Sequence, residues 1–212
     1  MSKHYFIIIL LFFSHLHCFC QDKDVELWLS AELRKEFGNK FRIYYEQGYR
    51  RYEFLQNIKT VHFETGGYYK PTRFITLGSY YRFFTNFSDF RKNRLSGELV
   101  LTGEMNRVSI KSRSQYNADF MKGEKADHYA RQRLLLEYGL RKIQLKPFVA
   151  SELIFHLQTN ESKNEQVRFD LGTEWKPAGQ HSFNIYYRYL IRRNVNNPLH
   201  SNIIGIDWIF GF

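Results

Sequence analysis

The chain has 212 residues but only two cysteines and four prolines, and its apolar segments are short. The longest apolar run, Tyr5–Phe13, is too short to cross a bilayer as a helix, so the sequence excludes a helical membrane protein. Both cysteines, Cys18 and Cys20, fall within the first twenty residues. If those residues are removed, disulfide scaffolds, thiol catalysis and cysteine-ligated metals are excluded from the remaining chain as well.

Residues 1–20 have the pattern of a signal peptide. A basic start precedes the apolar run, and Cys18 and Cys20 place small residues three and one positions before a cut. We therefore predict Sec-dependent export with cleavage near Cys20/Gln21, which leaves residues 21–212 as one domain. Lipidation of either cysteine is the alternative, and the large residue that precedes each of them disfavours it.

Aromatic and basic residues are abundant. Aromatic residues make up 18% of the chain, which argues against disorder, and 31 Lys and Arg stand against 21 Asp and Glu. Loss of Lys3 with the signal peptide leaves 30 basic and 21 acidic residues, a formal charge of +9. A basic, aromatic-rich chain can bind nucleic acid, but that requires both residue types on one exposed face. Here most aromatic residues of the late strands oppose most arginines, so we predict no nucleic-acid partner.

Apolar and polar residues alternate with period two along the rest of the chain, which predicts strands with one apolar face. For example, Leu95, Leu99 and Leu101 share one face, and Ser96 and Glu98 share the other. Eleven such runs lie near 24–34, 40–51, 60–70, 73–84, 94–105, 107–116, 127–140, 143–157, 165–175, 181–192 and 201–212. Most have ten to twelve residues, about the length that a tilted strand needs to cross a bilayer. Strands of soluble sheets are usually half as long.

The connections between these runs alternate in predicted length. Short turns are expected at 36–40, 71–72, 106, 141–142 and 176–180, and longer polar loops at 52–59, 85–93, 117–126, 158–164 and 194–200. This alternation is typical of outer-membrane barrels, whose turns are periplasmic and whose loops are extracellular. We predict an all-β fold, an antiparallel transmembrane β-barrel of 10–12 strands. An antiparallel barrel needs an even number, so twelve is preferred and the first run is the doubtful one.

The final run is the most specific segment. Ile204, Ile206, Trp208, Phe210 and Phe212 alternate on one face, and Phe212 is the last residue. Such a strand resembles the C-terminal signal that the barrel-assembly machinery reads in outer-membrane proteins. We therefore predict that Trp208, Phe210 and Phe212 form the assembly signal, with the assembly machinery and outer-membrane lipid as partners.

Several short motifs follow one another along the chain. They are Leu27-Trp28-Leu29, Tyr80-Tyr81-Arg82, Pro147-Phe148-Val149-Ala150-Ser151-Glu152-Leu153, Leu171-Gly172-Thr173-Glu174, Tyr186-Tyr187-Arg188-Tyr189 and Asn202-Ile203-Ile204-Gly205. Their order resembles a family of exported barrels of Gram-negative bacteria that is known only as a domain of unknown function. The resemblance covers nearly the whole chain after the signal peptide. It implies a barrel located in the cell outer membrane, and it brings no activity or catalytic residues.

The polar face of the strands would line the lumen. Its candidate residues are Arg107, Lys111, Arg113, Arg131, Arg133, Glu98, Glu104, Arg168 and Arg188. A barrel of this size is only slightly wider than the eight-stranded kind that side chains can fill. Arginines and carboxylates could pair across it, so we favour a structural or narrow-lumen barrel filled by such networks. The alternative is an anion-favouring channel for a small anionic solute, because Arg107, Lys111, Arg113, Arg131 and Arg133 lie on neighbouring strands with few acids between them.

Enzymatic and metal-binding functions find weaker support. A lipid hydrolase would need a serine and a histidine in contact, and the candidates are His200-Ser201-Asn202 and His156 with Ser162. Neighbours in a strand point to opposite faces, which separates His200 from Ser201. A metal site needs three or four ligands, whereas only His62 and Glu64 share a face. We predict no enzyme activity, metal or cofactor, and the oligomeric state is left open.

Overall fold

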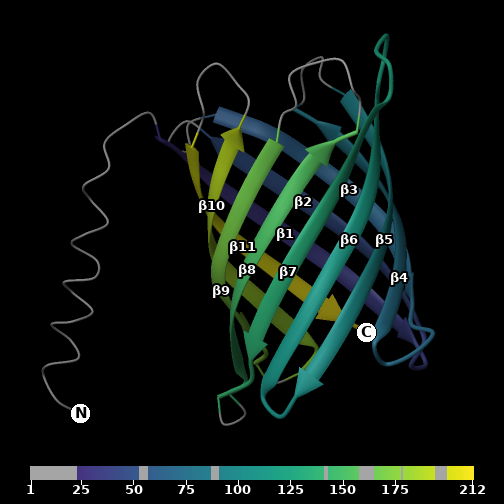
Figure 1. Ribbon diagram of the computed structural model, residues 1–212, viewed down its shortest axis with the longest axis vertical. Helices are drawn as coiled ribbons and strands as arrows, with labels where there is room; N and C mark the ends of the chain where they lie inside the picture. Colours follow the sequence, from purple (N-terminus) through teal and green to yellow (C-terminus); the bar gives the residue numbers. More distant parts are fainter. Residues whose placement is uncertain are drawn as a thin grey trace, which may run out of the picture.

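The computed structural model describes residues 23–52, 57–86, 91–140, 143–157, 165–177, 179–193 and 200–212. Within these ranges eleven tilted strands close into a barrel (Figure 1). They are β1 (Lys23–Phe37), β2 (Phe41–Tyr52), β3 (Asn57–Tyr69), β4 (Ile75–Thr85), β5 (Arg91–Met105), β6 (Val108–Met121), β7 (Asp127–Tyr138), β8 (Leu145–His156), β9 (Glu165–Trp175), β10 (His181–Arg193) and β11 (His200–Gly211). The predicted signal peptide and its cleavage site lie outside the described residues.

Every strand pairs antiparallel with its neighbour in sequence, and β1 and β11 close the ring as a parallel pair from Lys23↔His200 to Arg34↔Gly211. The all-β barrel and its range of 10–12 strands are confirmed, but the preferred number of twelve is wrong for the described chain. An odd number leaves the first and last strands running in the same direction, so their seam is parallel. The even-number rule holds only where every pair is antiparallel.

The connections separate into two ends (Figure 1). We call the end where β1, β3, β5, β7, β9 and β11 finish the turn end, and the end where β2, β4, β6, β8 and β10 finish the loop end. The intervals between consecutive strands differ in length between the two ends less than predicted, because strands extend into the expected loops. β6 runs to Met121, so Asn117 belongs to the barrel wall. At the turn end, Gly38 and Asn106 have φ of 59° and 56°, the left-handed conformation that glycine and asparagine tolerate best.

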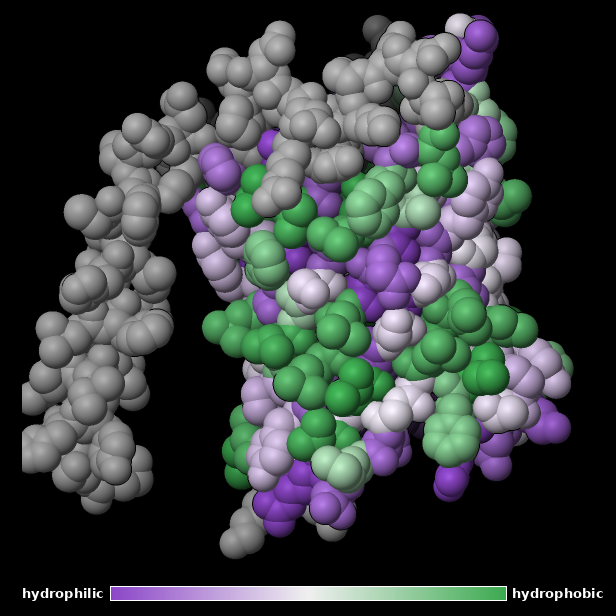
Figure 2. All heavy atoms as spheres, viewed as in Figure 1, coloured by the Kyte–Doolittle hydropathy of each residue, from purple (hydrophilic) through white to green (hydrophobic). Residues whose placement is uncertain are grey.

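The wall has its apolar side chains outside and its charged side chains inside. Leu33, Leu99 and Ile185 point outwards and are exposed, whereas Glu26 and Glu152 point inwards and are buried. Figure 2 shows hydrophobic side chains over much of the outer surface, interrupted by a hydrophilic patch. This arrangement is the inverse of a water-soluble protein. None of the described residues forms a helix long and apolar enough to cross a membrane.

Aromatic side chains flank the apolar outer surface at both ends. Towards the loop end, tyrosine hydroxyl groups contact polar side chains of the next strand. These contacts are Tyr81–Asn93 (2.5 Å), Tyr116–His128 (2.7 Å), Tyr187–Asn202 (2.5 Å) and Tyr189–His200 (2.9 Å). Towards the turn end, Trp208 Nε1 donates to His181 Nδ1 at 3.1 Å, and Phe41 stacks on Tyr69 with ring centroids 4.8 Å apart. The two sets form aromatic girdles.

Glycines on the inner face make room for large rings of the neighbouring strand. Gly205 lies opposite Tyr186, and Gly48 lies opposite His62. A Cβ atom at either glycine would overlap the ring across from it. These rings can therefore lie flat against the wall, which leaves space in the lumen for the charged side chains.

Candidate functional site

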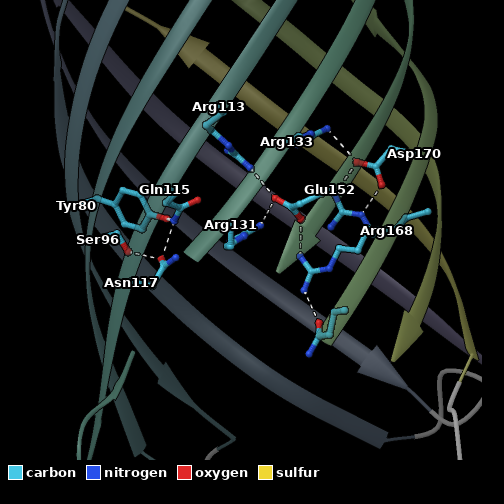
Figure 3. A network of polar contacts seen from close by, with 12 residues as sticks. Tyr80, Ser96, Arg113, Gln115, Asn117, Arg131, Arg133, Glu152, Arg168 and Asp170 are labelled. Carbon is cyan, nitrogen blue, oxygen red and sulfur yellow. Dashed lines mark hydrogen bonds and ion pairs between the residues drawn. The ribbon is translucent and has the colours of Figure 1, made fainter. Parts of the chain in front are cut away.

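A deeply buried part of the lumen is built around Glu152 on β8, which is 1% exposed. Its carboxylate accepts hydrogen bonds from Arg131 Nη2 at 2.7 Å, Arg168 Nη1 at 3.0 Å and Arg113 Nη2 at 3.1 Å (Figure 3). The three arginines come from β7, β9 and β6, so a single carboxylate links four neighbouring strands. We call these four residues the Glu152 cluster. The ion pairs compensate for the cost of removing a carboxylate from bulk water.

A second carboxylate, Asp170 on β9, extends this arrangement to β10. Arg188 donates to it twice, from Nε at 2.6 Å and from Nη2 at 2.9 Å, in the bidentate geometry that suits a guanidinium. Arg133 Nη2 donates to the same carboxylate at 2.9 Å. Five arginines therefore surround two buried acids, and the interior of β6–β10 is held together by charge.

Next to the Glu152 cluster lies an uncharged network (Figure 3). Ser96 Oγ and Gln115 Nε2 each donate to Asn117 Oδ1 at 2.7 Å, and Gln115 also contacts the Tyr80 hydroxyl. Asn117 is fully buried. The prediction of a loop over 117–126 left Asn117 out of the lumen. The alternation of Gln115, Asn117 and Asp119 continues the polar face of β6 and is the signal that could have located it.

A cavity of about 430 Å³ occupies the lumen. Its charged lining comprises nine basic residues (Arg50, Arg82, Lys92, Arg94, Arg113, Arg131, Arg133, Arg168 and Arg188) and seven acidic ones (Glu32, Glu46, Glu64, Glu98, Asp119, Asp127 and Asp207). With Glu152 and Asp170, which bind the guanidinium groups, acids and bases are equal in number. Most charges are paired directly. Arg94, for example, makes a bidentate contact with Asp119 at 2.6 and 2.9 Å.

The structure places most predicted lumen residues inside the barrel. Arg113, Arg131, Arg133, Arg168 and Arg188 meet around the two carboxylates, and Glu98 lines the cavity. Lys111 lies nearer the turn end, where its Nζ is 2.7 Å from Glu137. The expectation that few acids separate the basic residues fails for Arg113, Arg131 and Arg133, because carboxylates of β8 and β9 reach them.

Two predicted residues lie elsewhere. Arg107 is exposed in the turn between β5 and β6, so its assignment to the lumen is wrong. Strand β5 ends at Met105, and the two-residue turn that follows takes Arg107 out of the alternating pattern. Glu104 keeps the inward parity of β5 but is exposed at the turn end.

Of the predicted assembly signal, Trp208 and Phe210 lie on the outer face of β11 near the turn end, and Phe212 directly follows the strand. Trp208 contacts His181 as described, and the rings of Phe210 and Phe212 stack 6.3 Å apart. The backbone N–H of Phe212 donates to the Arg34 carbonyl at 3.0 Å. The final residue therefore takes part in the seam between β1 and β11.

Of the candidate hydrolase residues in the described ranges, His200 and Ser201 do not form a catalytic pair. His200 lies on the outer face, and Ser201 is buried on the inner face. His156 contacts Asp127 at 3.1 Å, and its suggested partner Ser162 lies outside the described residues. His62 contacts Glu46 at 2.8 Å. No group of three or more potential metal ligands occurs in the described ranges.

Comparison with known proteins gives a family without an assigned activity. No curated protein matches the chain. Among solved structures, the translocator domain of the autotransporter NalP from Neisseria meningitidis is similar, with a TM-score of 0.49 and 10% sequence identity, over 74% of this chain and 70% of that one. Residues 25–200 match the family described as "Protein of unknown function (DUF2490)". Because this match spans most of its length, the chain belongs to the DUF2490 family.

Proposed function

We propose that this chain is a β-barrel of the bacterial outer membrane, exported by the signal peptide 1–20 with its cleavage near Cys20/Gln21. We also propose that its lumen is filled by paired charges rather than open as a pore. The observation that carries the proposal is the inverted distribution of side chains. Exposed leucine, isoleucine and aromatic residues cover the outside, and arginines and carboxylates fill the inside. Water as the outer solvent would make this arrangement unfavourable, whereas lipid favours it.

The aromatic girdles support a membrane location independently. Tyrosine and tryptophan have an apolar ring and a polar tip, and they concentrate where hydrocarbon meets the head groups. Here the loop-end tyrosines present hydroxyl groups to histidine and asparagine, and Trp208 presents its indole N–H to His181. The strands, each of eleven to fifteen residues, are long enough to span the hydrocarbon between the girdles.

The charge network supports a filled lumen. Displacing one arginine of the Glu152 cluster would weaken the compensation of a carboxylate that is only 1% exposed. The cavity of about 430 Å³ has the size of a pocket for one small molecule, not of the wide aqueous channel of larger porins. We therefore propose a structural or binding role without free diffusion of solutes.

Cell fractionation tests the location. The protein should be found in outer-membrane fractions, begin at Gln21 by amino-terminal sequencing, and migrate differently on gels before and after boiling, as folded barrels do. Recovery as a soluble periplasmic protein with no heat-dependent shift would contradict a membrane barrel.

Planar-bilayer recording tests the filled lumen. Refolded protein, shown by circular dichroism to be β-structured, should give no discrete conductance steps, while an open porin inserted under the same conditions provides the positive control. Stepwise currents with anion preference in a salt gradient would overturn the filled lumen and favour the channel.

We also propose that the barrel has no hydrolase activity, because His200 and Ser201 face opposite sides of the wall. Purified protein should release no fatty acid from phospholipid vesicles. Release that is lost in Ser201→Ala but retained in Ser182→Ala would contradict this proposal.

A further inference from the structure

Arg50 differs from the other basic residues that line the cavity. It projects inwards from β2 near the loop end. Each of the other eight has a carboxylate within ion-pair distance. In the part of the chain that the structure describes, Arg50 has neither an ion pair nor a hydrogen bond, and its guanidinium carbon lies 4.0 Å from the centre of the Trp28 ring.

Other arginines of the cavity wall lie around Arg50, each paired with a carboxylate of its own. Arg82, Arg94 and Arg188 act on it electrostatically from neighbouring parts of the cavity wall. Arg188 also lies over the Trp28 ring, at 5.0 Å from its centre. The indole face stabilises a cation, but a cation–π contact leaves the N–H donors of a guanidinium without an acceptor. A guanidinium with free donors among other guanidiniums is therefore an attractive position for an anion.

Trp28 provides the flat surface that the Arg50 guanidinium contacts. Trp28 is buried, and its Nε1–H donates to Glu26 Oε2 at 2.8 Å, which fixes the plane of the indole ring. A guanidinium stacked on that ring directs its N–H groups outwards along its own plane. Two parallel donors of this kind match the two oxygens of a carboxylate or a phosphate.

We propose that the loop half of the lumen binds a small oxyanion, carrying a carboxylate or phosphate group, on Arg50. Arg82, Arg94 and Arg188 add to the positive potential at that point while they remain bound to their own carboxylates. The cavity of about 430 Å³ limits the ligand to one small molecule. The site goes beyond the filled structural barrel, because it gives the lumen a ligand that enters without crossing the wall.

Titration of the folded barrel in detergent tests this site. Changing Trp175 and Trp208 to Phe leaves Trp28 as the only tryptophan, so its fluorescence reports on the ring beneath Arg50. Inorganic phosphate and succinate are added separately at constant ionic strength maintained with chloride. A saturable change in fluorescence is expected with at least one of them, and methylammonium chloride should give none. No saturable change with either anion would overturn the proposal.

Variants then localise the binding. Arg50→Gln should weaken the apparent affinity at least tenfold, and Arg50→Lys, which keeps the charge but loses the paired donors, at least threefold. Arg107→Gln is the matched control, because Arg107 is exposed in a turn outside the lumen, and its affinity should equal that of the parent. If Arg50→Gln does not fold, as judged by its shift on gels, Arg50→Lys decides the question. Unchanged affinity in a folded Arg50 variant would refute the site, whatever the conductance recordings show.

Discussion

Replacement of Glu152 by Gln removes the charge at the centre of the lumen while keeping the size of the side chain. Three guanidinium groups would then lose their common carboxylate. The remaining amide oxygen can accept a hydrogen bond but carries no compensating charge. We expect Glu152→Gln to lower the free energy of unfolding and to loosen the inner face of β6–β9.

The size of the effect follows from burial. Breaking a buried ion pair by removing one partner typically costs about 3–5 kcal/mol. The side chains of Arg113, Arg131 and Arg168 are 28%, 14% and 14% exposed, so cavity water screens part of the loss. We therefore expect the lower end, about 3 kcal/mol, which is more than a hundredfold in the equilibrium constant of unfolding.

Urea unfolding of the barrel in lipid vesicles, followed by circular dichroism, measures this difference. Glu174→Gln is the matched control, since its partners Lys146 and Lys176 are 44% and 50% exposed, and exposed pairs contribute at most about 1 kcal/mol. The slope of free energy against urea should not change in either variant. Equal stabilities for the two variants would refute the view that the Glu152 cluster holds the lumen together.

Three further changes test the wall, the packing and the seam. Leu99→Arg should destabilise the inserted barrel by roughly 2–4 kcal/mol, because Leu99 faces outwards near the middle of its strand. Ser109 faces inwards between Glu104 and Glu137, so Ser109→Arg should insert normally. Similar yields of folded protein for the two variants would contradict the assignment of faces. Gly205→Ala should lower the free energy of unfolding by about 1–3 kcal/mol, because the added methyl group overlaps the Tyr186 ring. In a double-mutant cycle measured by urea unfolding, the Gly205→Ala change should cost much less in a Tyr186→Ala background. Strictly additive effects would contradict the contact. Deletion of Phe212 removes a backbone hydrogen bond to Arg34 at the seam and should slow assembly of the barrel. The expected result is less heat-modifiable barrel and more degradation in the periplasm. A normal amount of heat-modifiable barrel would contradict the predicted role of the last residue.

The fold class, the positions of most strands and the faces of most of their residues could be predicted from the sequence. Period-two alternation is a local property, because each side chain on a strand points opposite to its neighbours whatever the strand pairs with. Leu99 and Glu98 could thus be assigned to opposite faces before any pairing was known. Strand lengths followed from the same pattern, and β9 runs over 165–175 as predicted.

How the ring closes and which charges meet depend on contacts between distant parts of the chain. The parallel seam of β1 with β11 depends on where the two ends of the wall meet in space, which no local pattern encodes. In the same way, Arg113 and Glu152 are 39 positions apart in sequence and meet because two intervening strand pairings bring them together. The alternating pattern predicts only that Ser96 points inwards, whereas the structure shows that it is buried and hydrogen-bonded to Asn117. Alternation fixes the side of the wall to which a residue points, but the register between strands fixes its partners, and register depends on the packing of the whole barrel.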